Sequence, residues 1–232
     1  MRLRVPNDTT TRDRTAQNHG QYGGRQMSRP DQALDPEVAA HRDPDHEVAP
    51  LFVERWSPRA MSGDPVDESA YRALFEAARW APSSYNAQGW RFLYAPRNGD
   101  HWETYLDLLY EQNRTWAKDA GVLVAVASRT VREGREGTEP ASTHSFDAGA
   151  AWQNLALEGA RRDLVVHAME GYDEEAAREA LAVPEEFELE AMIAVGERGD
   201  TESLPEPLRE REVPSGRKPV DEIAVRGRFP ED

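Results

Sequence analysis

An uninterrupted apolar run at residues 122–127, with the sequence VLVAVA, constrains the fold more than any other feature. A strand with one face in water alternates apolar and polar side chains, whereas this run has no polar face. We therefore predict a strand that is buried on both sides, and residues 189–195 are predicted as a second buried strand. Such strands require a sheet with a covering layer on each face.

The remaining elements are predicted from periodicity and from helix-stop signals. One helical face is formed by Tyr71, Leu74, Phe75 and Ala78, and this helix is expected to end at Trp80, before Pro82. Further helices are predicted at 48–55, 102–109, 145–162 and 173–181, further strands at 90–95 and 165–168, and a polar loop at 129–143. Strands separated by helices of mixed length indicate an α+β or α/β sandwich, with one sheet covered on both sides.

The chain of 232 residues is predicted to consist of a tail and one domain. Residues 1–46 have little hydrophobic patterning and many Pro, Asp, Gly, Gln and Arg residues. Such a segment cannot bury enough apolar surface to offset the entropy lost on ordering. We predict a disordered tail at 1–46 and a folded domain at 47–232, with Met27 as an alternative start of translation.

Cysteine is absent, which excludes disulfides, thiolate nucleophiles and cysteine-ligated metal sites. No segment approaches the roughly 20 consecutive apolar residues of a membrane span. The N-terminus is rich in Arg, Asp and Thr and lacks the apolar stretch of a signal peptide, so the cytoplasm is the expected location.

The formal net charge is −15, and the predicted domain carries all of it, because residues 1–46 hold equal numbers of arginines and acids. An acidic surface repels nucleic acid and anionic membranes, which argues against both as partners. Only two of the 28 basic residues are lysines, Lys118 and Lys218. A host with a salty cytoplasm and a genome of high GC content are both compatible with this bias.

Standard nucleotide-binding and nucleophile motifs are missing from the sequence. It has neither G-x-G-x-x-G nor a Walker A sequence. It also lacks the G-x-S-x-G elbow, so Ser83 or Ser84 with His144 and Asp147 is a poor candidate for a catalytic triad. The six histidines lack metal-ligand spacing, and no metal site is predicted.

Two basic segments and one polar turn are the candidate binding elements. A phosphate dianion on an acidic protein requires a local basic cluster, which RWSPR at 55–59 or SGRKP at 215–219 could supply. Ser83, Ser84, Asn86 and Gln88 lie in a turn between a helix and a strand, where hydrogen-bonding groups can face a ligand. Taken singly, each segment is more simply explained as a solvated loop.

Taken together, these segments resemble the flavin-dependent nitroreductase family. ARWAPSSYNAQGWRF at 78–92 is similar to the family pattern A-R-x-A-P-S-S-x-N-x-Q-P-W-x-F, from which only Gly89 departs. RWSPR resembles the opening R-R-S-x-R motif, with Trp56 in place of the second arginine, and SGRKP resembles the closing R-K-P or K-x-R element. Three more segments are similar in the same order: EQNRTWAKDAGVLVAV, HSFDAGAAWQNLAL and HAMEGYD.

The resemblance implies a dimeric three-layer α/β/α sandwich with a mixed central sheet flanked by helices, and FMN as cofactor. The residues implied to bind FMN are Arg55, Trp56, Ser57, Arg59, Pro82, Ser83, Ser84, Asn86, Gln88, Asn113, Met169, Glu170, Gly171, Gly216, Arg217 and Lys218. Of these, Arg55, Ser57 and Arg217 correspond to phosphate contacts. The backbone of Glu170 and Gly171, the implied catalytic positions, corresponds to the segment at the reactive edge of the flavin. Helix 145–162 is implied to pack the homodimer.

The implied reaction is the NAD(P)H-dependent reduction of a nitroaromatic, quinone, enal or similar small acceptor. A ping-pong mechanism is expected, because the sequence offers no separate dinucleotide fold. The alternative is a family member that binds flavin without NAD(P)H turnover, as a binding protein or in oxygen-dependent flavin chemistry. The family sets its substrate through variable loops such as 129–143, so the physiological acceptor is not predicted.

Overall fold

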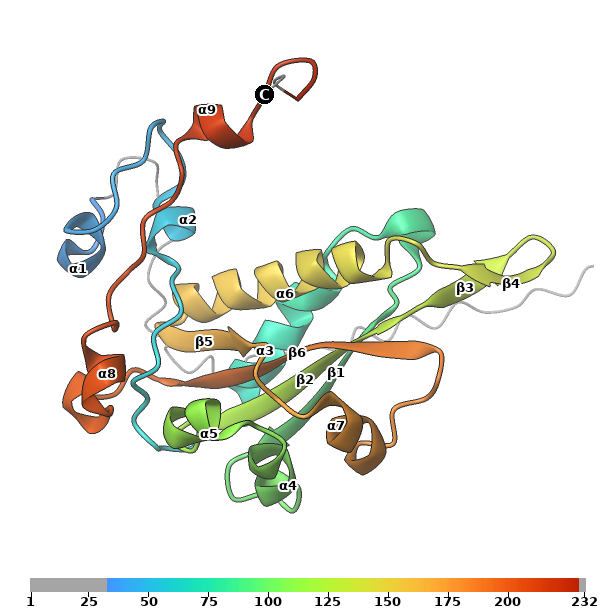
Figure 1. Cartoon of the computed structure of the whole chain (residues 1–232), viewed down its shortest axis with the longest axis horizontal. Coiled ribbons are helices and arrows are strands. Elements are labelled where there is room, and N and C mark those ends of the chain that lie inside the picture. The colour runs from blue at the N-terminus through green and yellow to red at the C-terminus, as the bar shows by residue number, and fades with distance from the viewer. Residues whose placement is uncertain (1–32, 230–232) are drawn as a thin grey trace, which may run out of the picture.

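The computed structural model describes residues 33–229, which form one α+β body (Figure 1). The helices are α1 (Pro36–Ala39), α2 (Pro50–Glu54), α3 (Glu68–Arg79), α4 (Trp102–Asp107), α5 (Glu111–Ala117), α6 (His144–Arg161), α7 (Glu174–Ala180), α8 (Glu206–Arg209) and α9 (Val220–Ile223). The strands are β1 (Trp90–Pro96), β2 (Val122–Arg129), β3 (Val131–Gly134), β4 (Gly137–Pro140), β5 (Leu164–Met169) and β6 (Phe187–Glu197). Short 3-10 turns occur at Ser84–Asn86 and Thr201–Ser203. None of the helices within residues 33–229 has the length and hydropathy needed to cross a membrane.

The central sheet has four strands in the order β1-β2-β6-β5. Its pairings within the described residues are all antiparallel, whereas the resemblance implied a mixed sheet. The connections explain this difference. Pro96 at the end of β1 pairs with Val122 at the start of β2, so α4 and α5 form an excursion from one end of the sheet and the chain returns beside the strand it left.

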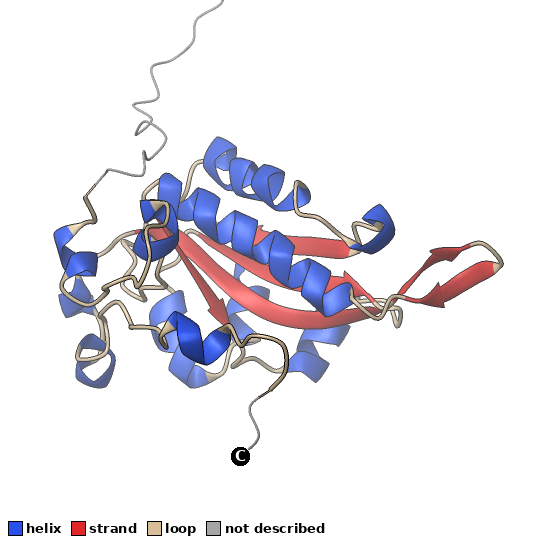
Figure 2. Ribbon diagram, turned by 90° about the horizontal axis from the view of Figure 1, so that it is seen from above, coloured by secondary structure: helices blue, strands red, loops and turns tan. Residues whose placement is uncertain are grey.

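A crossover links β2 to β5 through the β3-β4 hairpin and α6. Strand β6 lies between β2 and β5 and runs antiparallel to both, so these two strands point the same way without pairing. Helix α6 runs across one face of the sheet (Figure 2). Gly159 permits this close packing, because a Cβ atom at this position would lie 2.4 Å from Cγ2 of Val166 on β5.

Helices cover both faces of the sheet, as the apolar run at 122–127 predicts (Figure 2). Alternate residues of β2 enter different cores: Val122, Val124 and Val126 pack with α3 and α6, and Leu123, Ala125 and Ala127 pack with α4, α5 and α7. Each fully buried Val or Leu side chain contributes about 1.5–3 kcal/mol relative to an exposed one. Burial on both faces is the physical reason for the missing polar face of this strand.

Helix α3 follows the pattern that its sequence predicts. The Asp67 side chain caps its N-terminus by accepting a hydrogen bond of 2.8 Å from the backbone N–H of Ser69. Tyr71, Leu74 and Ala78 are buried against the sheet. The helix ends at Arg79 with Trp80 as its C-cap, so the turn that follows starts from a rigid element.

Two segments are more ordered than the sequence predicts. Residues 131–140, expected as part of a loop, form the β3-β4 hairpin, which projects from the body (Figures 1 and 2). Its strands are short and polar, so they lack a periodic signal. Residues 33–46, expected as disordered tail, include α1, whose Val38 is 3% exposed. The remainder of the predicted tail, residues 1–32, lies outside the described residues.

Candidate functional site

The two basic segments of the sequence meet at one cavity beside α2. This cavity has a volume of about 530 Å³ and takes its walls from residues 41–55 and 216–223. Arg55 lies directly after α2, and Gly216, Arg217 and Lys218 lie before α9. Segments from opposite ends of the domain therefore supply the cations of the cavity, which we call the arginine cavity.

Arg55 is the most buried of these cations. Its Nη1 donates a hydrogen bond of 3.3 Å to Oγ of Ser57, while its Nε is buried without a hydrogen-bond partner in the described part of the chain. Burial lowers the pKa of Arg55, and the neighbouring guanidinium of Arg217 lowers it further. A half-buried cation with an unsatisfied donor and a like-charged neighbour is suited to an anionic ligand.

A third arginine at the arginine cavity, Arg42, was not identified from the sequence. Its Nε donates to the carbonyl oxygen of Ser215 at 2.9 Å. Its Nη1 donates to the carbonyl oxygens of Val53 and Arg55, at 3.0 Å in the case of Arg55. Burial lowers the pKa of Arg42, with further contributions from Arg217 and Arg55. Backbone carbonyls leave no pattern in a sequence, and Arg42 lies in the segment predicted as tail, so no sequence signal points to it.

Arg217 is held within its own loop. Its Nη1 donates to Oγ of Ser215 at 3.0 Å and to the carbonyl oxygen of Gly216 at 2.8 Å. The next turn of the chain is fixed from outside, because the backbone N–H of Val220 donates to Oδ2 of Asp45 at 2.8 Å. Residues 33–46 thus hold the loop that carries Arg217.

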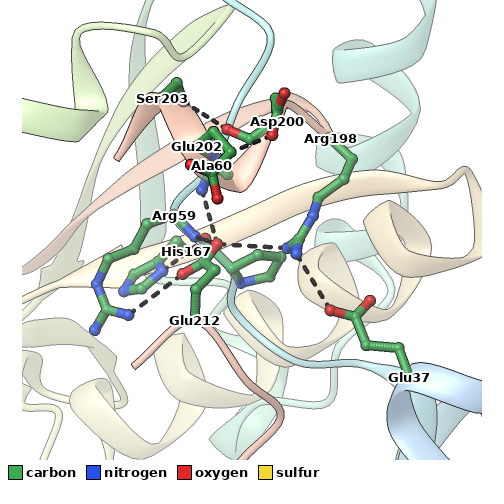
Figure 3. A network of polar contacts seen from close by, with 10 residues as sticks. Glu37, Arg59, Ala60, His167, Arg198, Asp200, Glu202, Ser203 and Glu212 are labelled. Atoms are coloured by element: carbon green, nitrogen blue, oxygen red, sulfur yellow. Dashed lines mark hydrogen bonds and ion pairs between the residues drawn. The ribbon is translucent and has the colours of Figure 1, made fainter. Parts of the chain in front are cut away.

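Glu212 holds the second half of the RWSPR segment (Figure 3). Its side chain is buried, and its Oε1 accepts hydrogen bonds from the backbone N–H groups of Arg59 at 2.6 Å and Ala60 at 2.8 Å. The guanidinium of Arg59 lies 3.6 Å from Oε2, and that of Arg198 lies 3.5 Å from Oε1. Arg59, one of the residues that the resemblance implied to bind FMN, is therefore paired with an acid of the same chain.

Trp56 lines a different cavity from that of Arg217. This second cavity has a volume of about 230 Å³ and lies between α1, the end of α6 and the start of β5. The guanidinium carbon of Arg198 lies 4.7 Å from the centroid of the Trp56 ring, within the range of a cation–π contact. One face of the ring that the resemblance assigned to the cofactor thus contacts a cation of the same chain.

His167 on β5 lies beneath the same segment. Its Nδ1 donates to the carbonyl oxygen of Pro58 at 2.9 Å, and its ring centroid lies 4.6 Å from that of Trp116. Burial is the main reason that the pKa of His167 falls below its ordinary value. His167 therefore contributes a neutral, oriented ring to the support of RWSPR.

Asn113, Met169, Glu170 and Gly171 form a second group, where β5 ends beside the start of α5. Nδ2 of Asn113 donates to the carbonyl oxygen of Gly171 at 2.9 Å, and Tyr110 N donates to the same oxygen at 3.2 Å. A Cβ atom on Gly171 would lie 2.7 Å from Asn113 Nδ2, so any larger residue would displace the Asn113 amide from its present position. The side chain of Met169 is buried in the core, which leaves only its backbone for a ligand. Among the described residues, the backbone N–H of Gly171 has no acceptor.

The third group is the turn after α3, at Pro82 to Gln88. Its left-handed residues, with φ between 49° and 54°, are Tyr85, Asn86 and Gln88. This conformation costs roughly 1–2 kcal/mol for each residue other than glycine. Two hydrogen bonds of 3.0 Å hold the turn: Gln88 N donates to Ser83 Oγ, and Ser84 N donates to Oδ2 of the buried Asp147 on α6. The turn is therefore fixed in shape and anchored to the start of α6.

A polar network that the sequence did not predict lies where β2, β6 and the start of α6 meet. Oγ of Ser128 lies 2.7 Å from Nδ1 of His144 and donates to the carboxylate of Glu190. Ser145 donates to the same carboxylate at 2.7 Å. Ser128 is fully buried, so its hydroxyl is not the accessible nucleophile of a catalytic triad. Its residues come from three elements, and no local motif could have joined them.

The structure thus brings most of the predicted site residues into three groups: the arginine cavity, the Asn113–Gly171 group and the turn at 82–88. Trp56 and Arg59 lie outside these groups. Among the described residues, no hydrogen bond or ion pair joins one group to another. Within residues 33–229 there is also no cluster of three or more side chains that could hold a metal ion.

Comparison with known proteins gives consistent matches. A solved structure described as an oxidoreductase containing FMN is 43% identical, with a TM-score of 0.80, and the match covers 82% of this chain and 97% of that chain. An uncharacterized 15.4 kDa protein from the ask 5′ region of Mycolicibacterium smegmatis is 31% identical over 147 residues, which is 60% of this chain and 97% of that protein. A Streptomyces coelicolor protein named "Putative NADH dehydrogenase/NAD(P)H nitroreductase" is 34% identical over 86 residues, 37% of this chain and 42% of its own length.

The nitroreductase family matches over residues 53–117 and 110–197. These ranges contain RWSPR, the turn after α3, and the Asn113–Gly171 group, and together they cover more than half of the chain. The chain belongs to the nitroreductase family.

Proposed function

We propose that this protein is an FMN-dependent oxidoreductase that uses NAD(P)H to reduce a small acceptor such as a nitroaromatic, a quinone or an enal. The observation that carries the proposal is the meeting of Arg55 and Arg217 at one cavity. Both arginines occupy positions that the family resemblance assigns to the FMN phosphate. A solved relative that is 43% identical contains FMN, which supports the same cofactor here.

The arginine cavity fits the phosphate end of FMN. Arg217 lowers the pKa of Arg55, so the two guanidiniums are close enough to repel each other. A phosphate dianion would relieve this repulsion and could accept a hydrogen bond from the unsatisfied Nε of Arg55. Ser57, Lys218 and the backbone of Gly216 would complete the phosphate site.

Arg59 and Trp56 are given supporting roles in this proposal. The Arg59 guanidinium is engaged by Glu212, and one face of the Trp56 ring contacts Arg198. These contacts hold the segment that carries Arg55 and Ser57, so both residues would act through the shape of the backbone.

The Asn113–Gly171 group fits the ring end of the same cofactor. FMN, when bound, supplies the two-electron redox chemistry, and the protein supplies position and electrostatics. Asn113 orients the peptide of Gly171 through its carbonyl oxygen, and the unpaired N–H of Gly171 is available to donate to the edge of the flavin. Glu170 would contribute its backbone beside Gly171, and this arrangement requires no side-chain acid or base.

We also propose a homodimer in which the turn at 82–88 of one protomer reaches the flavin of its partner. Three large aromatic side chains are exposed at this end of the molecule: Trp80 by 70%, Tyr85 by 84% and Phe146 by 80%. Exposed apolar groups that gather in one region are typical of an interface. Ser83, Ser84, Asn86 and Gln88 would then present their polar groups across that interface.

NAD(P)H is proposed as the electron donor because the Streptomyces coelicolor relative carries NADH and NAD(P)H in its name. The described residues contain no dinucleotide-binding motif, so donor and acceptor would use one flavin face in turn. Initial rates at several quinone concentrations should therefore give parallel double-reciprocal lines. Intersecting lines would show a ternary complex and contradict the ping-pong order.

The absorbance spectrum of the purified protein tests the cofactor directly. The protein should be yellow, with non-covalent FMN. Arg55→Ala and Arg217→Ala should each weaken FMN binding by about 1.5–3 kcal/mol, the range for a hydrogen bond to a charged group. Arg135→Ala, an exposed arginine in the turn of the β3-β4 hairpin, is the matched control and should bind like the wild type.

The outcomes separate the cofactor from the activity. Protein that stays colourless after incubation with excess FMN would overturn the proposal. Protein that binds FMN but does not oxidise NAD(P)H with a quinone would instead indicate the flavin-binding alternative given above.

A further inference from the structure

We propose that Arg42 is a positioning residue that sets the affinity of this protein for the phosphate end of FMN. Arg42 lies in residues 33–46, before the family match begins at residue 53. The inference rests on the proposed function, since it adds a residue to the same cofactor site. It concerns how the arginine cavity is held together.

Arg42 joins the two backbone segments that carry the other arginines of the cavity. On one side, its Nη1 bonds to the carbonyl oxygens of Val53 and Arg55, at the C-terminal end of α2. The last carbonyls of a helix lack partners within the helix, so a cationic side chain stabilises them. On the other side, its Nε bonds at 2.9 Å to the carbonyl oxygen of Ser215, two residues before Arg217. One planar guanidinium therefore fixes Arg55 and Arg217 relative to each other.

The segment that carries Arg42 is itself anchored to the domain. Val38 on α1 is buried, with 3% of its surface exposed. Glu37 lies 3.3 Å from the guanidinium of Arg198, and Asp45 accepts a hydrogen bond of 2.8 Å from Val220 N. The residues on both sides of Arg42 in the sequence are thus anchored to the domain, so Arg42 can act as a clamp, a side chain that fixes two backbone segments relative to each other.

Electrostatics explain why a clamp is needed. Arg42, Arg55 and Arg217 line one cavity, and the pKa values of Arg42 and Arg55 are both lowered by Arg217 in addition to burial. Three cations at one cavity repel each other when no anion is bound. Bonds from Arg42 to backbone carbonyls oppose this repulsion, because carbonyl oxygens carry partial negative charge. Without them, the loop at 215–220 would move away from α2 before phosphate arrives.

The test compares FMN with riboflavin, which has the same ring and lacks the phosphate. Apo-protein of the full chain is titrated with each flavin, and quenching of flavin fluorescence gives the dissociation constant. Arg42→Ala should bind FMN about 10- to 100-fold more weakly, the loss expected for hydrogen bonds to a charged group, and riboflavin within about twofold of wild type. Arg42→Lys should lose as much, because a lysine keeps the charge but cannot span three carbonyls. Arg135→Ala is the control.

Each outcome decides the question. Full FMN affinity in Arg42→Lys would show that a positive charge at this position suffices. It would overturn the inference that the hydrogen bonds of Arg42 position the cavity. Equal losses for FMN and riboflavin would show a general structural effect, and unchanged FMN affinity in Arg42→Ala would show no role; both overturn the inference. Wild-type protein that binds neither flavin would instead overturn the proposed function.

A second variant covers the case in which Arg42→Ala does not fold. Asp45→Ala removes the other bond between residues 33–46 and the 215–220 loop, the one to Val220 N. It should weaken FMN binding by a smaller factor, about two- to fivefold, with riboflavin unchanged. FMN affinity equal to wild type in Asp45→Ala would then overturn the inference.

Discussion

Replacing Glu212 by alanine should destabilise the domain strongly. The carboxylate of Glu212 joins the segment that follows α8 to the segment that follows α2. Glu212 is 4% exposed and accepts backbone hydrogen bonds of 2.6 and 2.8 Å from Arg59 and Ala60. A hydrogen bond to a charged group contributes about 1.5–3 kcal/mol, so two contribute about 3–6 kcal/mol. Alanine would leave both N–H groups without their acceptor and Arg59 without its acid. We expect a loss of about 3–5 kcal/mol, the usual cost of breaking a buried pair.

Thermal unfolding followed by far-UV circular dichroism measures this loss. For a domain of this size, 1 kcal/mol lowers Tm by about 2–4 °C, so Glu212→Ala should unfold about 6–20 °C below the wild type. Glu210→Ala, at an exposed position two residues earlier, is the matched control and should change Tm by no more than about 2 °C.

A conservative variant separates the backbone bonds from the charge. Glu212→Gln keeps an acceptor for both N–H groups but places an amide donor near the Arg59 guanidinium, so its Tm should lie between those of the wild type and Glu212→Ala. A Tm of Glu212→Ala within about 2 °C of the wild type would refute the reasoning that this carboxylate holds the two segments together.

Three further predictions concern other parts of the molecule. Gly171→Ala should lower the flavin content of the purified protein, because the new Cβ would lie 2.7 Å from Nδ2 of Asn113; unchanged flavin content would contradict this. The free energy of unfolding of the wild type, measured by urea titration, should fall as pH falls below about 6.5, because burial lowers the folded-state pKa of His167 and the unfolded state takes up the proton first. The free energy of unfolding of His167→Gln should fall less over the same pH range. Equal pH dependence in the two proteins would contradict this. Removal of residues 1–32 should leave FMN affinity unchanged, whereas removal of residues 1–46 should weaken FMN binding because it deletes Arg42. If the two truncated proteins bind FMN with the same affinity, Arg42 is dispensable.

The layered core could be predicted because burial of its strands and helices depends on the spacing of apolar residues along the sequence. The valines and alanines of residues 122–127 have no polar alternation, and the structure buries them in two different cores. Helix α3 shows one apolar face and a stop signal, and both match its observed position. Antiparallel pairing could not be predicted in this way, because it depends on where α4 and α5 return the chain.

The site could be predicted only as separate segments. Arg55 and Arg217 were assigned by resemblance, and their position at one cavity depends on the whole fold. Arg42 could not be found, because it bonds to backbone carbonyls, which every residue has. The buried contact of Ser128 with His144 was equally hidden, because it joins two elements that are separated in sequence by the β3-β4 hairpin.

The closing of the arginine cavity by residues 215–220 has a consequence for biosynthesis. A chain is made from its N-terminus, so Arg217 leaves the ribosome after every strand of the sheet. Arg42 and Arg55 leave the ribosome early, but the hydrogen bond from Arg42 to Ser215 cannot form until residues 215–217 have also been synthesised. Under the proposed function, FMN would then bind only near the end of chain synthesis or after it. A nascent chain stopped after β6 would contain every strand of the sheet and yet remain colourless.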